Sequence, residues 1–142
     1  MTHTQDSAAL LALAKRVEAI VGDGVVAMRD AWLAIHGPEP ASGYAPRCKP
    51  SFCPKWEAYI QARCRFMNLL DMGAFLEAAT LLVPEGHRFE VTTTGFKPGA
   101  IVCGNLLFGP HEGAHAATPA LALTAACLRA HAALAHPKEQ SS

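Results

Sequence analysis

Apolar residues recur every three or four positions in two stretches near the start of the chain, and this spacing is typical of helices that bury one face. A helix over residues 8–21 is predicted by Leu10, Leu13, Ala14, Val17 and Val21, with Ser7 as its N-cap. A helix over residues 24–36 is predicted by Val25, Met28, Trp32 and Ile35, with Asp23 as its cap. Residues 1–38 are therefore expected to form a helical hairpin that ends at Gly37 and Pro38.

The segment that follows is rich in proline and cysteine. Five prolines between residues 37 and 54 exclude regular structure there and indicate a long loop. Pro54 suits the first turn of a short helix that continues to Arg63. We therefore treat residues 39–63 as a loop and a short helix that join two halves of one compact domain.

The second half, residues 64–136, mixes helical and strand-like patterns. Residues 64–68 contain strand-like side chains, and Asp71 suits the N-cap of a helix over residues 72–83. Residues 87–94 alternate apolar and polar side chains, and residues 100–108 are more apolar, so the two predict an antiparallel hairpin. Thr118 and Pro119 then begin a final helix that runs to about residue 135. The predicted class is α+β, with a small antiparallel sheet packed against helices in an α-β-α sandwich-like arrangement.

Three motifs of this half resemble a known family. These are an Asp helix cap, the turn Leu82-Val83-Pro84-Glu85-Gly86 and the segment TPALAL at residues 118–123. In the order of these three motifs the chain resembles the phage ABA sandwich domain, a family of uncharacterised bacterial prophage proteins. The similarity covers about residues 64–135. It implies a strand, a helix, two further strands and a closing helix, and a phage origin. It implies no catalytic residues.

The charge and composition of the chain limit the classes of function that we expect. Twelve basic and twelve acidic residues leave no net charge, so no long-range field attracts nucleic acid non-specifically. No apolar run is long enough to span a membrane, and the N-terminus lacks the layout of a secretory signal. An odd number of cysteines, five, agrees with free thiols in a reducing compartment. We therefore expect a cytoplasmic protein, and the resemblance described above implies that it is encoded by a phage and acts in the bacterial host cell.

Residues 111–115 read HEGAH, a literal H-E-x-x-H motif. On a helix, His111 and His115 would share one face and bind zinc, while Glu112 would act as the general base. Gly113 and the nearby Pro119 disfavour such a helix, and the residues of the longer metzincin motif are absent. We expect a polar loop here and keep a minimal zinc metallohydrolase as the alternative.

The cysteines suggest a second metal site. Cys48, Cys53 and Cys64 are spaced roughly like a zinc loop, to which His36 could add a fourth ligand. Free thiols without a ligand are the competing interpretation. No cofactor is expected, and zinc is the metal to which either motif points.

A basic and aromatic segment spans residues 47–66. Cations beside flat rings suit a phosphorylated ligand or nucleotide, and the candidate ligand-binding residues are Arg47, Lys49, Trp56, Tyr59, Arg63 and Arg65. The competing interpretation is that the aromatic rings pack into the core while the cations face solvent. We expect a non-catalytic accessory protein that binds a host protein or a small anionic ligand, for instance a sponge for a nucleotide signal of host defence. A structural virion or assembly component, which would form a homo-oligomer, is the remaining alternative.

Overall fold

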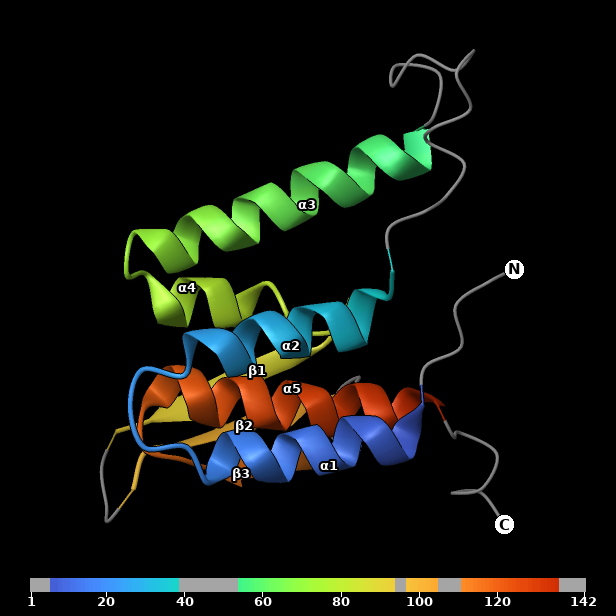
Figure 1. Cartoon of the computed structure of the whole chain (residues 1–142). Coiled ribbons are helices and arrows are strands. Elements are labelled where there is room, and N and C mark those ends of the chain that lie inside the picture. The colour runs from blue at the N-terminus through green and yellow to red at the C-terminus, as the bar shows by residue number, and fades with distance from the viewer. Residues whose placement is uncertain (1–5, 39–53, 94–96, 105–110, 136–142) are drawn as a thin grey trace, which may run out of the picture.

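The protein is an α+β fold of five helices and three strands within the part of the chain that the structure describes (Figure 1). The computed structural model describes residues 6–38, 54–93, 97–104 and 111–135. The elements in order are α1 (Ser7–Glu18), α2 (Val25–His36), α3 (Pro54–Asp71), α4 (Phe75–Thr80), β1 (Arg88–Thr92), β2 (Gly99–Cys103), β3 (His111–His115) and α5 (Pro119–Ala135). The predicted fold class is confirmed.

The N-terminal helical hairpin forms, but α1 ends at Glu18, so Val21, expected on its apolar face, lies beyond the helix and is exposed. Leu10, Leu13, Ala14 and Val17 are buried on α1, and Met28, Trp32 and Ile35 are buried on α2. The cap of α1 is Asp6 rather than Ser7, because the Asp6 carboxylate accepts the backbone N–H groups of Ala8 and Ala9. The N-cap of α2 is Gly24 rather than Asp23, and no side chain caps the helix. Asp23, one residue earlier, accepts the N–H of Val25 in the turn that leads into α2.

One long helix replaces the short helix and strand that we expected after Pro54. Residues 64–68 lie inside α3, because Phe66 and Leu70 are buried one helical turn apart. Asp71 ends α3 and does not cap the next helix. α4 begins at Phe75 after Ala74, whose side chain makes no capping hydrogen bond, so the expected helix over residues 72–83 is shorter than its pattern indicated.

The sheet has three antiparallel strands in the order β1-β2-β3. In its register Phe89 pairs with Val102, Ile101 pairs with Gly113 and Gly99 pairs with His115. The first two strands lie where the sequence predicts them. The third is formed by HEGAH, where a loop was expected, and buried Ala114 and Ala116 follow the two-residue period of a strand that buries one face.

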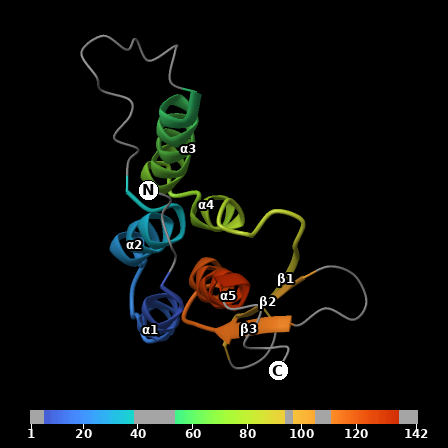
Figure 2. The ribbon, with the colours of Figure 1, turned by 90° about the vertical axis from the view of Figure 1, so that its right-hand side faces the viewer.

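Helix α5 lies at the centre of the molecule. Its residues from Ala120 to Leu128 are buried on every side, because the sheet covers one side and α1, α2 and α4 lie around the others (Figure 2). Thr118 caps α5 by accepting the N–H of Leu121, as predicted. The buried Thr124 hydroxyl donates to the Ala120 carbonyl, so this polar group has a partner inside the core.

The described helices lie on one face of the sheet, with α3 farthest from it (Figure 2). One continuous hydrophobic core joins residues of the N-terminal hairpin to residues of α3, α4, the sheet and α5. In the described ranges, no helix combines the length and apolar character that crossing a membrane requires.

Candidate functional site

The HEGAH segment does not form the helix that zinc chemistry requires. In β3, His111 and His115 are four strand residues apart, a separation of roughly 13 Å along the backbone. Glu112 is adjacent to His111 and therefore belongs to the opposite face of the strand. The expected loop is also wrong, since the segment pairs with β2 over its full length. The geometry of a helical H-E-x-x-H site is absent.

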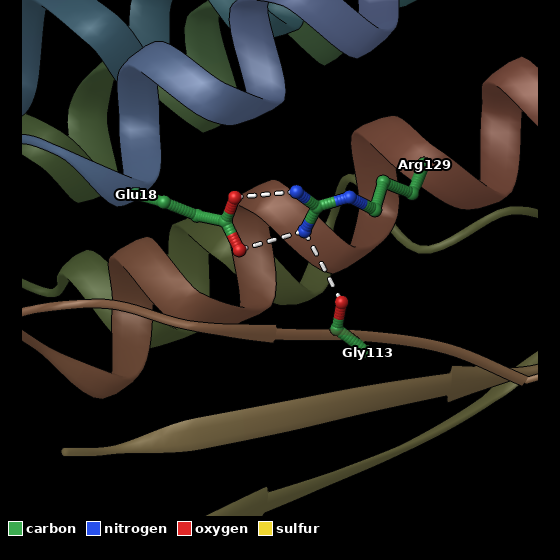
Figure 3. Close-up of polar contacts among 3 residues, drawn as sticks. All are labelled: Glu18, Gly113 and Arg129. Carbon is green, nitrogen blue, oxygen red and sulfur yellow. Dashed lines mark hydrogen bonds and ion pairs between the residues drawn. The ribbon is translucent and has the colours of Figure 1, made fainter.

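β3 is instead held at its outer edge by an ion pair (Figure 3). Arg129 of α5 and Glu18 of α1 form a two-pronged pair, with 2.7 Å between Arg129 Nη1 and Glu18 Oε2. The same Nη1 donates to the backbone carbonyl of Gly113 at 3.1 Å. Three elements therefore meet at one guanidinium, and one of them, α1, contributes a residue 111 positions away from Arg129 in the sequence.

The charges of this ion pair stabilise each other. The hydrogen bond to Arg129 lowers the pKa of Glu18, with partial burial acting in the opposite direction and the backbone N–H of His115 adding to the lowering. The hydrogen bond to Glu18 raises the pKa of Arg129, and Glu112 adds to that effect. Both side chains are mostly covered, with exposed fractions of 20% for Arg129 and 25% for Glu18. These residues hold the fold together, and sequence reasoning did not find them.

The candidate cysteine site is not assembled by described residues. Cys48 and Cys53 lie outside the described residues, and Cys64 is exposed on α3. Cys103 is half-buried and Cys127 is buried in α5. Within the described ranges, no group of three or more His, Cys, Asp or Glu side chains is placed to hold a metal ion.

The basic and aromatic segment is only partly brought together. Arg47 and Lys49 lie outside the described residues. The Tyr59 hydroxyl donates to the Gly37 carbonyl at 2.9 Å, and its ring packs edge-on against the buried Trp32. Tyr59 is thus part of the packing between α2 and α3.

The two arginines of this segment face different directions. Arg63 and Arg65 are exposed, but two residues apart on α3 they project to opposite sides of the helix. Trp56 is half-buried and lies two turns before Arg63 on the same side. The part of the predicted ligand site that the structure describes is therefore a single cation near a single ring.

A more developed feature lies at the end of the molecule where the α1–α2 turn, the α3–α4 turn and the start of α5 meet (Figure 1). A hollow of about 450 Å³ opens between these turns, and we call it the end hollow. Its apolar and glycine lining consists of Gly22, Gly73, Phe75, Leu76, Pro119 and Ala120. Asp23 and Thr118 contribute the polar side chains of its lining.

Two glycines shape the end hollow. Gly22 and Gly73 have φ angles of 128° and 76°, in the region that glycine adopts without a steric penalty. A Cβ atom at either position would meet nothing within 4 Å, so these glycines leave open space in the walls. Each reverses the chain between two helices, and together the turns bring Leu76 of α4 near Pro119 of α5.

The most exposed large apolar side chains of the described chain are found at this same end. Val21 is 96% exposed, Met72 is 77% exposed and Val26, near the start of α2, is 69% exposed. Val21 and Met72 directly precede the two glycines of the end hollow in the sequence. Isolated exposed apolar residues are ordinary on protein surfaces, but apolar groups gathered around a hollow are typical of a protein interface.

Comparison with known proteins adds no relative to this description: no family model, no curated protein and no solved structure matches the chain. The interpretation of the site therefore depends on its own geometry.

The sequence contained a signal for the end hollow that we did not use. Val21-Gly22 and Met72-Gly73 both place a large apolar residue at a helix end, directly before a glycine turn. An apolar residue at such a position is commonly buried against its own helix. Only the structure shows that both side chains are left exposed and that both turns lie at one end of the molecule.

Proposed function

We propose that this is a non-catalytic accessory protein, of phage or prophage type, that binds a host protein through the end hollow. The observation that carries the proposal is an open hollow of about 450 Å³ with the half-exposed Leu76 in its lining, and with the exposed Val21 and Met72 directly before two of its lining glycines. A hollow of this size and lining suits an apolar anchor residue of a partner, such as Leu, Met or Phe. The phage origin is supported by the sequence motifs of residues 64–135 alone.

The surrounding chemistry favours binding over turnover. The side chains of Asp23 and Thr118 accept backbone N–H groups of Val25 and Leu121, so both already have hydrogen-bond partners at the starts of α2 and α5. The described residues that line the hollow include no histidine, cysteine or lysine. Affinity for an apolar group needs only the removal of its surface from water, which this lining provides.

The test compares matched charge substitutions at the two ends of α5. Met72→Glu places a charge next to Gly73 of the end hollow, and Leu134→Glu places one at the other end of α5, where Leu134 is 50% exposed. Tagged wild-type protein and both variants are used to capture proteins from a bacterial host lysate, and affinity is then measured with the purified partner.

We expect one partner to be retained by the wild type and by Leu134→Glu and lost with Met72→Glu. The affinity for that partner should fall about tenfold or more, since a charge at the centre of an apolar contact must be desolvated without a compensating pair. Equal capture by all three proteins would contradict the proposal, and so would equal loss with both variants. Circular dichroism of the variants checks that each remains folded.

A small phosphorylated ligand is the second candidate, favoured by Arg63 and Trp56 on one side of α3. Its test is isothermal titration of the wild type and of Arg63→Gln with ADP and with a cyclic dinucleotide. Binding that weakens with Arg63→Gln but not with Arg65→Gln would assign the ligand to that side of α3. Equal binding by both variants would remove the candidate.

A further inference from the structure

The two edges of the sheet are treated differently in this fold. At the β3 edge, the ladder to β2 continues beyond the strand, where the Ala116 N–H donates to the Pro98 carbonyl at 3.1 Å. Residues of β3 with even numbers therefore direct their backbone groups toward β2, and Gly113 directs its own outward. The outward Gly113 carbonyl is the one that Arg129 binds. The Glu18–Arg129 pair thus occupies the position of a fourth strand and closes this edge.

The same alternation identifies the backbone groups at the other edge. Gly113 pairs with Ile101, so Ile101 directs its N–H and carbonyl toward β1, where its partner is Glu90. Phe89 and Val91 flank Glu90 and must direct their backbone groups away from the sheet. Among the described residues, no hydrogen bond joins the backbone of Phe89 or Val91 to another element. The β1 edge is open in the part of the chain that the structure describes.

An open edge of this kind is a template for a further strand. Phe89 lies on the face of the sheet that packs against α5, opposite buried Val102, and yet it is 42% exposed. Arg88 and Glu90 alternate with it on the other face and are exposed. Among the described residues, β1 therefore presents a partly exposed aromatic ring, two pairs of backbone groups with no partner in another element, and two opposite charges.

We infer that β1 pairs antiparallel with β1 of a second copy of the chain, with Phe89 facing Phe89 of the partner subunit across a two-fold axis. The result is one six-stranded sheet whose outer edges are the two closed β3 edges. This surface is separate from the end hollow, so the inference does not depend on the proposed function.

The charges of Arg88 and Glu90 favour the register with the two-fold axis at Phe89 over the register with the axis at Glu90. When the axis passes at Phe89, Arg88 lies opposite Glu90 of the partner subunit, and Glu90 lies opposite the partner's Arg88. When the axis passes at Glu90, the two Glu90 carboxylates oppose each other, which is unfavourable. In the favoured register these charged residues form non-hydrogen-bonded pairs, whose side chains approach most closely.

The backbone groups also match in this register. The N–H of each Phe89 donates a hydrogen bond to the Phe89 carbonyl of the other subunit. The N–H of each Val91 donates to the His87 carbonyl of the other subunit. The His87 N–H already donates to the Pro84 carbonyl, so only its carbonyl is needed. The two Phe89 rings become cross-strand neighbours and cover each other, and such aromatic pairs are among the more favourable in antiparallel sheets.

Sedimentation of charge-swapped variants tests the pairing in the full chain. The wild type, Glu90→Arg, Arg88→Glu and the double variant Arg88→Glu/Glu90→Arg are compared over a range of protein concentrations. We expect a reversible dimer of the wild type, a dissociation constant raised about tenfold or more in each single variant, and recovery in the double variant. Both residues are exposed, so each substitution should leave thermal unfolding unchanged at protein concentrations low enough to keep the wild type monomeric.

Three results would overturn the inference: a wild type that stays monomeric at every concentration, a dimer that the single substitutions leave unchanged, or a double variant that does not recover. A crosslink gives a second test of the register. The Cα atoms of a hydrogen-bonded antiparallel pair lie about 5.5 Å apart, which suits a disulfide. Phe89→Cys should therefore form oxidised dimers beyond those of the wild type, while Thr92→Cys, displaced from the axis, should not. Equal crosslinking of the two variants would contradict the register.

Discussion

Arg129 of α5 and Glu18 of α1 are 111 residues apart in the sequence and form a two-pronged ion pair at the edge of β3. The pair does more than join two helices, because the guanidinium also binds the carbonyl of Gly113 and thereby supplies the donor that an edge strand lacks. An exposed strand edge invites pairing with other chains, and this contact closes one of the two edges.

Removal of the guanidinium should destabilise the fold. Arg129→Gln leaves the Glu18 carboxylate and the Gly113 carbonyl without their charged donor in a partly covered site. We expect a loss of about 1–2 kcal/mol in the free energy of unfolding, measured by urea denaturation, with allowance for partial solvent screening.

The matched control for that loss is Arg16→Gln. Arg16 and Asp30 are 4.0 Å apart and both well exposed, so this change should alter the stability by less than about 0.5 kcal/mol. Equal losses for Arg16→Gln and Arg129→Gln would mean that the β3 edge needs no charged donor.

Stability should also depend on His131. Burial lowers the pKa of His131 below 6.5, although its contact with the Leu82 carbonyl, 2.8 Å from Nε2, acts in the opposite direction. The unfolded chain therefore takes up a proton at this residue before the folded chain does. Stability is expected to fall as the pH drops below about 6.5, with a slope from this residue of at most about 1.4 kcal/mol per pH unit.

His131→Gln separates this contribution from other acid effects. The glutamine amide can still donate to the Leu82 carbonyl but does not titrate, so the variant should lose less stability between pH 7 and pH 5.5 than the wild type does. Unfolding in urea at a series of pH values measures both, and identical pH profiles for His131→Gln and the wild type would count against the assignment.

Two features of the structure favour glycine at position 24: its positive φ and the close approach of the Leu121 side chain. Its φ is 72°, and a Cβ atom there would overlap the Leu121 side chain of α5. Gly24→Ala should therefore lower the stability by about 2–4 kcal/mol, from a strained φ and from overpacking together.

Gly86 separates the two contributions, because its φ is 79° and a Cβ atom there would meet nothing within 4 Å. Gly86→Ala should lower the stability by about 1 kcal/mol, the effect of φ alone. Thermal and urea unfolding of both variants provide the comparison. An equal loss of stability in the two variants would show that the Leu121 side chain moves to accommodate the added Cβ atom without a cost in free energy.

The thiols should differ in reactivity. Burial raises the pKa of Cys127, while Cys64 is exposed on α3. In the native protein, Cys64→Ser should lower the number of thiols that react rapidly with an aromatic disulfide reagent by one, whereas Cys127→Ser should leave that number unchanged. In denaturant both variants should have one reactive thiol fewer than the wild type. Rapid native reaction of Cys127 would show that α5 opens readily.

The local pattern of the sequence predicted the helices at both ends of the chain and the first two strands. The α1–α2 hairpin and α5 were identifiable because their apolar spacing, capping residues and turn glycines lie within a few residues of one another. β1 and β2 were identifiable from a period of two between turn residues. These signals are local, and tertiary packing agrees with them here.

Other features depended on partners that are distant in the sequence. HEGAH is a strand because β2 pairs with one of its edges, while the Arg129–Glu18 ion pair binds the other. The residues next to HEGAH in the sequence do not reveal these hydrogen-bond partners. α3 continues through residues 64–68 because Phe66 and Leu70 are buried in a core that α5 and α2 complete.

The sequence by itself determined the class of the fold, the presence of the hairpin helices and of α5, and the absence of a net charge that would attract nucleic acid. The tertiary structure alone decided that two glycine turns and the start of α5 form one hollow, and that the two edges of the sheet differ. The reason is physical: capping and periodic burial act between near neighbours, whereas the exposure of Met72 and the closure of β3 depend on which distant segments fold against them.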